Sequence, residues 1–331
     1  MIDYLRWYPI RIGMNDSGVC IMLTDDAKQT IDSKAGKKTL TPQPKKKKRR
    51  KRYRSRPAQW TITILRIVGL GYATILLTLV AMETRLVYPG AFFADHRVSD
   101  GAGYPEIETV EYSTTDGIKL RGRLIERAGS GDIVLFFHGN DVKAKWMDDW
   151  LRQLSGEFNA TAMVAEYRGY DDDLTPNERG VLADSFSACD YLCDRYGKSQ
   201  SEIILYGQSL GGGCAVALAA RGGAKALVLE RTFDRLVNVA GNKYPFIPVN
   251  YLMRNRYDSI AKLTAYKGPR IHLHGTTDDL IPIQHGEALY ACAGSGLKHW
   301  IAVDGLGHHD SLPLQSLREI VAKVNEFTAQ P

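Results

Sequence analysis

The sequence predicts an α/β protein built on a doubly wound, mostly parallel sheet. Short apolar runs typical of buried strands alternate with helical patterns from about residue 106 onward. Loops that contain Gly, Ser, Asp and His follow several of those runs. In sheets of this kind the chemistry lies at the carboxyl ends of the strands, so these loops are where a site is expected.

The elements of this domain follow one another with short connections. Residues 107–113 and 118–125 flank Thr114–Gly117 and are predicted to form a hairpin. The later predicted strands are 133–137, 161–166, 203–206, 226–229, 271–274 and 300–303, and the predicted helices are 142–154, 178–196, 210–220, 284–293 and 310–328. The globular domain is therefore placed at residues 104–331.

An irregular insertion at about residues 231–267 interrupts this alternation. It carries an apolar set: Leu236, Val239, Tyr244, Phe246, Ile247, Val249, Tyr251 and Leu252. A cap over a reactive centre would use such side chains to exclude water and to shape a pocket. A helix packed on the core would use them equally, so both interpretations stay open.

The positive charge of the chain is concentrated in one tract. The formal net charge is +6, but ten Lys and Arg side chains lie between positions 45 and 56, which leaves −4 for the remainder. No nucleic-acid partner is expected, because the rest of the chain has no basic surplus to follow a phosphate backbone. Residues 1–59 lack apolar periodicity and are expected to form a largely disordered basic segment, within which Met14 or Met22 is an alternative start.

Residues 60–82 are predicted to form a single transmembrane helix, because the run is apolar and long enough to cross about 30 Å of hydrocarbon. Arg66 lies near one end, and Trp60 and Tyr88 are placed as interfacial anchors. A buried helix or a cleaved signal peptide are the alternatives, although no Ala-x-Ala type site follows Met82. The basic tract should stay in the cytoplasm, so we expect a single-pass membrane protein with its globular domain on the opposite side.

The residues Gly207-Gln208-Ser209-Leu210-Gly211 match the pattern GxSxG between a predicted strand and a helix of small residues. Glycines flank a serine nucleophile at such a turn because side chains there would collide with the strand and the helix. A glycine-rich connecting loop is the alternative. We predict that Ser209 is a catalytic nucleophile.

A serine nucleophile needs a base and a carboxylate, which in this type of site follow it in the order Asp or Glu, then His. Asp278 follows the predicted strand 271–274, and His308 follows the last predicted strand. We predict that Asp278 orients the imidazole of His308. The imidazole then takes the proton from Ser209 and gives it to the leaving group.

Some residues next to Asp278 and His308 could take the same catalytic roles, and other residues nearby are expected to have structural roles. Asp279 is the rival carboxylate and His309 the rival base. Asp310 is expected to cap the terminal helix. His138 is expected to be a structural residue of its turn, and His285 has no supporting constellation.

Two backbone N–H groups are needed to stabilise the oxyanion that forms in acyl transfer. One is expected from Leu210, which follows the nucleophile at the start of a helix. The second is expected from Asn140, in the loop after the predicted strand 133–137. These residues complete the predicted site.

Neither a metal nor a cofactor is expected. The cysteines show no spacing typical of a disulfide framework or a zinc site; they are Cys20, Cys189, Cys193, Cys214 and Cys292. Cys189 and Cys193 are one helical turn apart and are expected to be buried apolar side chains rather than metal ligands.

Short motifs in one order carry a resemblance to a known family: Glu83–Pro89, Phe137–Asn140, Glu166–Tyr170, Tyr206–Gly211, Asp258–Ser259, His274–Asp278 and Gly307–His308. The chain from about Glu83 to Ala329 resembles the α/β-hydrolase superfamily. It most resembles the membrane-anchored branch with α/β-hydrolase domain-containing depalmitoylases and bacterial serine aminopeptidase-type relatives. The resemblance implies the α/β-hydrolase fold, a triad of Ser209, Asp278 and His308, and an oxyanion hole at Asn140 and Leu210.

The chain departs from that family at Asp171–Asp173, where Gly and Ser are usual. These carboxylates could bind a cation, disfavour acidic substrates or form a solvated turn, and we favour the turn. The predicted activity is hydrolysis of an ester or thioester, or of an amide, through an acyl-enzyme on Ser209. Expected substrates are acylated small molecules, lipids or proteins. The alternatives are an aminopeptidase-like serine peptidase, with Asp171–Asp173 as its ammonium site, and a catalytically silent tethered scaffold.

Overall fold

The computed structural model describes residues 12–14, 20–22, 56–93, 104–292 and 296–329. The chain divides into two units, Met1–Gln59 and Trp60–Pro331. In the first unit, strands β1 (Ile12–Met14) and β2 (Cys20–Met22) pair antiparallel. The other residues up to 55, with most of the basic tract, lie outside the described residues, so the predicted disorder there stays a prediction.

Helix α1 (Arg56–Val87) contains the predicted transmembrane segment and extends beyond both of its ends. Over Gln59–Val87 it is long and apolar enough to cross a membrane. Its most apolar stretch is not buried against the protein, which argues against a core helix. The last turns enter the globular domain and lead into the 3₁₀-helix η1 (Pro89–Phe92).

Tyr88 is not an interfacial anchor, so that prediction is wrong. Its side chain is fully buried, and its hydroxyl lies 2.9 Å from Asn255 Oδ1 and 2.9 Å from the Tyr257 hydroxyl. The physical reason is that α1 continues past the apolar run into the globular domain. The residues at its end therefore pack against protein instead of lipid headgroups.

The globular part contains an eight-stranded sheet in the order β10-β9-β8-β7-β5-β6-β4-β3. Neighbours from β10 to β6 are parallel, whereas β4 is antiparallel to both β6 and β3. The strands are β3 (Ile107–Ser113), β4 (Lys119–Ile125), β5 (Ile133–Phe137), β6 (Thr161–Val164), β7 (Ile203–Gln208), β8 (Ala226–Glu230), β9 (Arg270–Gly275) and β10 (Lys298–Val303). The predicted strands and the hairpin are confirmed.

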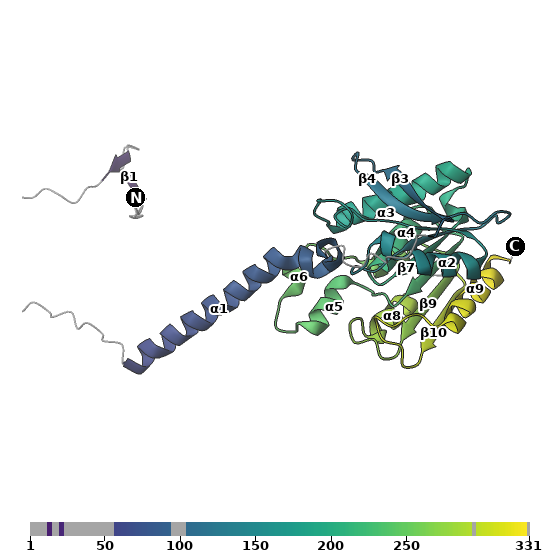
Figure 1. Cartoon of the computed structure of the whole chain (residues 1–331). Helices are drawn as coiled ribbons and strands as arrows, with labels where there is room; N and C mark the ends of the chain where they lie inside the picture. The colour runs from purple at the N-terminus through teal and green to yellow at the C-terminus, as the bar shows by residue number, and fades with distance from the viewer. Residues whose placement is uncertain (1–11, 15–19, 23–55, 94–103, 293–295, 330–331) are drawn as a thin grey trace, which may run out of the picture. The chain divides into compact units, whose positions relative to one another are not determined.

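Helices cover both faces of this sheet, as Figure 1 shows. One apolar core lies between the sheet and helices α3 (Glu178–Tyr196) and α4 (Leu210–Gly222). The other lies under α2 (Asp148–Phe158) and α9 (Leu314–Thr328). Helix α8 (Ile283–Ala291) follows β9. The fold is therefore the predicted doubly wound α/β sheet.

Two predicted helices begin elsewhere than expected. The predicted helix 142–154 consists of a 3₁₀ turn, η2 (Ala144–Trp146), and then α2; a second such turn, η3 (Gln200–Glu202), precedes β7. The last helix starts at Leu314 after Pro313, so Asp310 does not cap it. Asp310 instead accepts a hydrogen bond of 2.7 Å from the Gly307 N–H. Proline explains the late start, because its missing N–H is tolerated only at a helix's first turn.

The cap insertion, residues 231–267, contains α5 (Leu236–Lys243), α6 (Val249–Leu252) and α7 (Ser259–Leu263). Helix α7 packs against α4 on the core. Helices α5 and α6 lie beside the C-terminal end of α1, as Figure 1 shows. The packed-helix interpretation is therefore confirmed for α7, and the cap interpretation stays a prediction for α5 and α6.

Candidate active site

Ser209 sits in the tight turn between β7 and α4, with φ +53° and ψ −118°. This conformation is strained for a side chain other than glycine's, as in a nucleophile elbow. The flanking glycines are required by close contacts. A Cβ on Gly207 would lie 2.4 Å from the Gly211 oxygen, and one on Gly211 would lie 2.1 Å from the Phe137 oxygen. The GxSxG spacing therefore follows from the crowding of β5, β7 and α4.

Three predicted residues form one hydrogen-bonded chain. Ser209 Oγ lies 3.0 Å from His308 Nε2, and His308 Nδ1 lies 2.8 Å from Asp278 Oδ2. Asp278 follows β9 and His308 follows β10, so the loops meet at the carboxyl edge of the sheet beside Ser209. All three side chains are buried or nearly so. This arrangement can activate a serine hydroxyl.

The rival residues lie elsewhere. Asp279 is exposed. His309 is exposed as well, with its Nδ1 3.6 Å from Asp141 Oδ2. The structure therefore brings Asp278 and His308 to Ser209 and leaves their sequence neighbours at the surface.

The carboxyl group of Asp278 is held in its charged form. Burial raises its pKa, but hydrogen bonds from His274 and His308 and from the Ile281 N–H outweigh burial, so the net shift is well below the usual range. Oδ1 also accepts from the Leu280 N–H at 3.1 Å. A fixed, ionised carboxylate is what an imidazolium partner needs during proton transfer.

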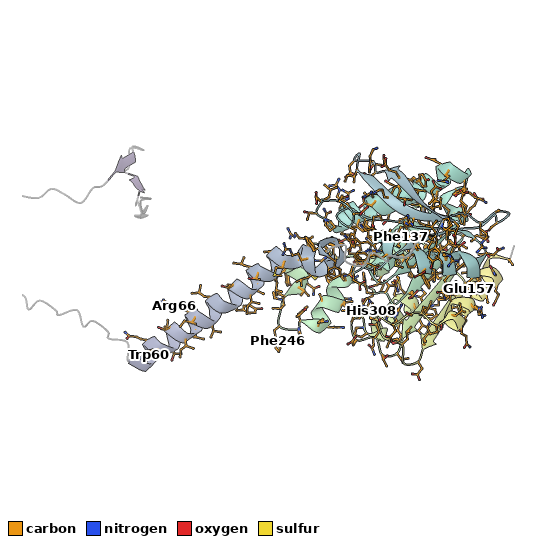
Figure 2. The ribbon with its side chains drawn as sticks, in the orientation of Figure 1. Trp60, Arg66, Phe137, Glu157, Phe246 and His308 are labelled. Carbon is orange, nitrogen blue, oxygen red and sulfur yellow. The ribbon has the colours of Figure 1, made fainter. Side chains whose placement is uncertain are left out.

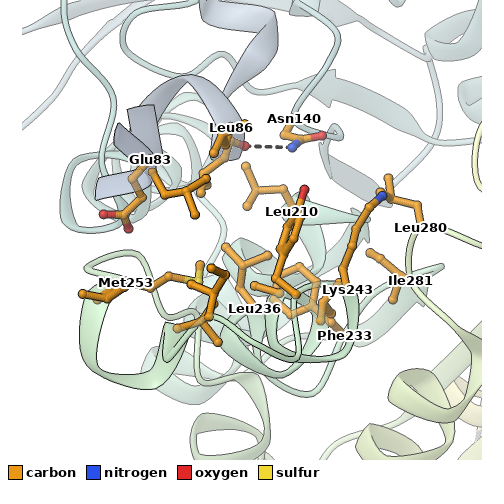
Figure 3. A pocket seen from close by; sticks show the side chains of 18 of the residues that line it. Glu83, Leu86, Asn140, Leu210, Phe233, Leu236, Lys243, Met253, Leu280 and Ile281 are labelled. Atoms are coloured by element: carbon orange, nitrogen blue, oxygen red, sulfur yellow. Dashed lines mark hydrogen bonds between the residues drawn. The ribbon is translucent and has the colours of Figure 1, made fainter. Parts of the chain in front are cut away.

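The two predicted oxyanion residues, Leu210 and Asn140, lie near Ser209. Leu210 is the first residue of α4, and Asn140 follows β5; with Ser209 both line one cavity. Asn140 is fixed by its side chain, whose Nδ2 donates to the Val87 oxygen at 2.8 Å, drawn as the dashed line in Figure 3. Its carbonyl accepts from the Gly90 N–H at 2.9 Å. The end of α1 therefore holds the loop that was predicted to provide the second oxyanion donor.

The cavity beside Ser209 has a volume of about 280 Å³ and a mostly apolar lining. Figure 3 shows that its walls come from α1, from the cap insertion and from the loop after β9. Lining side chains are Leu79, Val80, Leu86 and Val87 of α1, Leu280 and Ile281 of the loop, and Phe233, Leu236, Val239, Tyr244, Ile247, Leu252 and Met253 of the insertion. An apolar cavity next to a nucleophile is suited to the hydrocarbon part of a substrate.

A buried ion pair beside the triad was missed by the sequence analysis. Arg231 Nη2 lies 2.5 Å from Glu230 Oε1, and Arg231 Nη1 donates to the carbonyls of Gly307 at 2.9 Å and Asp310 at 2.6 Å. These carbonyls flank His308. Tyr206 donates to the other Glu230 oxygen at 2.5 Å. The pair therefore fixes the histidine loop to β8, and no local sequence pattern marks it.

Two further histidines have defined partners. His138 is buried, with Nδ1 2.7 Å from the Gly139 oxygen and Nε2 3.2 Å from Glu166 Oε1, which fits a structural role. His285, which was expected to have no constellation, has one: its Nδ1 lies 2.7 Å from Asp234 Oδ1 and its Nε2 3.0 Å from Asn242 Nδ2. That expectation is corrected, because the pair joins α8 to the cap insertion across a long stretch of sequence.

Two of the three carboxylates at 171–173 are engaged within the chain. Asp171 pairs with Arg121 at 2.5 Å and Lys145 at 2.9 Å. Asp172 Oδ1 accepts from the Gly169 and Leu174 N–H groups, both at 2.8 Å. This geometry agrees with a turn and leaves these two carboxylates poorly placed to receive a substrate ammonium group.

The predicted cysteine environment is found for one of the two helix α3 thiols. Cys189 is fully buried, and burial raises the pKa of its thiol well above the usual range. Cys193 is partly buried, and burial raises the pKa of its thiol as well. Cys189 is therefore an apolar packing group, and the raised pKa values leave both thiols in their neutral form.

Comparisons of the whole chain find relatives in bacteria, yeast and plants. The protein YfhR of Salmonella typhi is 30% identical over 241 residues, covering 66% of this chain and 80% of the relative. Protein bem46 of Schizosaccharomyces pombe is 28% identical and covers 73% and 87%. The α/β hydrolase domain-containing protein WAV2 of Arabidopsis thaliana is 26% identical and covers 66% and 77%. No protein-family model matches the chain.

Solved structures with the same fold include esterases. The Pyrococcus furiosus esterase Pf2001 has a TM-score of 0.56 at 17% identity, covering 69% of this chain and 97% of that structure. The thermostable carboxylesterase EstE1 from a metagenomic library has a TM-score of 0.54 at 16% identity, covering 77% and 96%. At this identity the likeness establishes the shared fold.

Proposed function

Because the chain belongs to the α/β-hydrolase superfamily, we propose that it is a serine hydrolase that cleaves an ester or thioester bond through an acyl-enzyme on Ser209. The observation that carries the proposal is the hydrogen-bonded chain from Ser209 through His308 to Asp278. The α/β-hydrolase relatives and the esterases that share the fold support a hydrolase in general.

The geometry fits a two-step reaction. With Nδ1–H of His308 donating to Asp278, Nε2 carries the lone pair that can accept the Ser209 proton. The serine oxygen would then attack the acyl carbon, and His308 would return the proton to the leaving alcohol or thiol. A water molecule would cleave the acyl-enzyme by the same route. The backbone N–H groups of Leu210 and Asn140 are assigned to the oxyanion.

The cavity favours an acyl substrate over a peptide with a free amino terminus. Its lining is mostly apolar. Glu83 is the acidic side chain on its α1 wall, and that carboxylate already accepts hydrogen bonds from the Arg254 and Asn255 backbone and side chains. An ammonium group would have to displace those partners.

Labelling with a fluorophosphonate tests the mechanism directly. The wild-type chain should label, and Ser209→Ala should not. His308→Ala should label at least 100-fold more slowly, whereas the matched variant His309→Ala should label at the wild-type rate. Equal loss from both histidine variants, or an unlabelled folded wild type, would refute the proposal and favour a silent scaffold.

A substrate panel then separates the bond types. p-Nitrophenyl acyl esters, acyl thioesters and aminoacyl amides are compared by kcat/KM with the same preparation. Higher kcat/KM for acyl esters or thioesters than for aminoacyl amides supports the proposal. The reverse order would establish the peptidase alternative.

We also propose that α1 anchors the enzyme in a membrane, with the basic tract on the cytoplasmic side and the hydrolase domain on the other. The length and composition of α1 and the positive flank support this topology. Protease treatment of sealed vesicles tests it. Digestion of residues 104–331 by protease added on the cytoplasmic face would overturn the orientation.

A further inference from the structure

One edge of the cap insertion exposes large apolar side chains. Phe246 is 86% exposed and Tyr251 is 91% exposed. They lie in residues 244–251, here termed the cap tip, which has no charged side chain. Figure 2 shows Phe246 on the outer side of the insertion. Side chains of this kind usually mark a surface that has a partner.

The cap tip is attached to α1. The Tyr72 hydroxyl donates a hydrogen bond of 2.7 Å to the Phe246 carbonyl. Around Tyr72 the helix is as exposed and apolar as the tip, with Leu70 and Ile75 both open to the surroundings. The exposed apolar side chains of the tip and those of α1 therefore meet at the contact between Phe246 and Tyr72.

The height of this contact along α1 identifies the partner. Crossing about 30 Å of hydrocarbon takes about 20 residues, so a span that starts at Trp60 ends near Val80. The membrane span cannot extend much beyond Val80, because Glu83 is already buried in the globular domain. Tyr72 lies about 12 Å along the axis before Val80, and a tilt of 40° still leaves about 9 Å of depth. The Phe246 carbonyl accepts the hydrogen bond from Tyr72, so Phe246 lies at the same depth below the membrane surface.

The backbone of the tip suits an apolar medium. Lipid offers no hydrogen-bond partners, so exposed N–H groups are costly there. Pro245 and Pro248 have no N–H to satisfy. The N–H groups of Ile247, Val249 and Tyr251 donate to carbonyls within the tip at 2.9, 2.7 and 3.0 Å.

Basic side chains border the tip on both sides in sequence. Lys243 precedes it, and Arg254 and Arg256 follow it; all three residues are exposed. An apolar tip between basic residues is typical of segments that insert about 5–10 Å into a leaflet and contact phosphate headgroups at its surface. The occupant favoured by this chemistry is a lipid bilayer, not another protein.

We infer that the cap tip inserts into the bilayer that α1 crosses, in the leaflet next to the globular domain. We also infer that the acyl substrate enters the cavity sideways from that leaflet. Leu79 and Val80 of α1 and Tyr244 and Ile247 of the tip line the cavity. These residues therefore connect the inserted surface to Ser209. The inference rests on the proposed anchoring and deepens the proposed hydrolase. It names long-chain acyl esters or thioesters dissolved in the membrane as the substrate class.

Depth-dependent quenching tests the insertion without using activity. The full chain, with all cysteines except buried Cys189 and Cys214 replaced by serine, receives Phe246→Cys and a nitrobenzoxadiazole label in vesicles of phosphatidylcholine and phosphatidylserine. Lipid with a spin label on its acyl chain should quench this fluorophore at least threefold more than one at Leu314→Cys, a partly exposed position on α9. Equal quenching at both positions would overturn the insertion.

Kinetics test the route of the substrate. Phe246→Ser with Tyr251→Ser should lower the rate on a long-chain acyl thioester in vesicles at least tenfold. The same double variant should keep kcat/KM for soluble p-nitrophenyl butyrate within twofold, because neither side chain lines the cavity. An unchanged rate on the vesicle substrate would refute entry from the bilayer.

The quenching and kinetic experiments distinguish a failure of this inference from a failure of the proposed function. If the wild type hydrolyses no ester but quenching at position 246 is strong, the hydrolase proposal fails and the insertion stands. If soluble esters are cleaved but quenching is absent, the enzyme stands and the insertion fails.

Discussion

Replacing Arg231 by Met tests two separate roles of this side chain, in the stability of the fold and in the position of His308. Arg231 is 2% exposed, and its guanidinium links Glu230 to the carbonyls of Gly307 and Asp310. Methionine has similar bulk but no donor. The replacement therefore leaves a buried carboxylate without its cation and frees the loop that contains His308.

The magnitude follows from these contacts. Removing one partner of a buried ion pair costs about 3–5 kcal/mol, because the remaining charge is left desolvated. A domain has about 5–15 kcal/mol of stability, so Arg231→Met alone should unfold much of the protein at a moderate temperature. Adding Glu230→Gln removes the buried charge and keeps a hydrogen-bond acceptor for Tyr206. Relative to Arg231→Met, the double variant should regain about 2 kcal/mol or more of unfolding free energy.

Activity should not return with stability. In the double variant the Gly307 and Asp310 carbonyls still lack their donor, so His308 is held less firmly. A displacement of a reacting group by about 1 Å lowers the reaction rate on the order of 100-fold. We expect kcat for a p-nitrophenyl ester to fall 10- to 100-fold while KM changes less than threefold.

The assay compares urea unfolding midpoints and steady-state kinetics of wild type, Glu230→Gln, Arg231→Met and the double variant. The single Glu230→Gln variant is the control, because it keeps both donors to the histidine loop. A double variant that regains stability and also turns over at the wild-type rate would refute a positioning role for Arg231.

Three other predictions use single side chains. Burial lowers the pKa of His272 to about 3, so the unfolded chain binds one more proton below its ordinary pKa of 6.5. Stability therefore falls as pH decreases between those values, and His272→Phe should flatten the slope of unfolding free energy by up to about 1.4 kcal/mol per pH unit, measured by urea unfolding. Gly211→Ala would place a Cβ 2.1 Å from the Phe137 oxygen and should abolish fluorophosphonate labelling. The control Gly156→Ala, at an exposed position of α2, should label normally and raise stability by up to about 1 kcal/mol. Val239→Trp narrows the apolar cavity and should lower the ratio of long-chain to short-chain ester kcat/KM at least tenfold; an unchanged ratio would place the acyl chain elsewhere.

The sheet and the meeting of Ser209, Asp278 and His308 could be predicted, because each residue or strand is marked by a pattern local to the sequence. A buried parallel strand is a short apolar run, and its register needs no further signal. The elbow at Ser209 is set by clashes of Gly207 and Gly211 with neighbouring backbone, so the glycines appear at fixed offsets. Asp278 and His308 each follow a strand of the same sheet, so topology brings them together without any sequence proximity.

The supporting contacts could not be predicted, because their partners have no fixed spacing. The contact of Arg231 with the histidine loop is recognisable only once that loop is seen against β8. The pair of Asp234 and His285 joins two elements 51 positions apart. Burial raises the pKa of Asp234, but its hydrogen bonds from His285 and Asn238 make the net shift downward, which a sequence cannot show.

The end of α1 shows why the error at Tyr88 has a functional meaning. Hydropathy measures only how apolar a segment is, and lipid and protein core present the same environment to an apolar helix. The sequence could therefore not separate the exposed apolar part of α1 from the part that builds the cavity. In the structure the two parts are one continuous helix: the Val87 carbonyl accepts a hydrogen bond from the Asn140 side-chain amide, and Leu79 and Val80 line the space beside Ser209. A helix that served only as a tether would end in a linker, whereas this helix forms a wall of the cavity beside Ser209. Removing α1 should therefore open that cavity as well as release the enzyme, and a truncated chain should lose its acyl-chain selectivity even towards soluble esters.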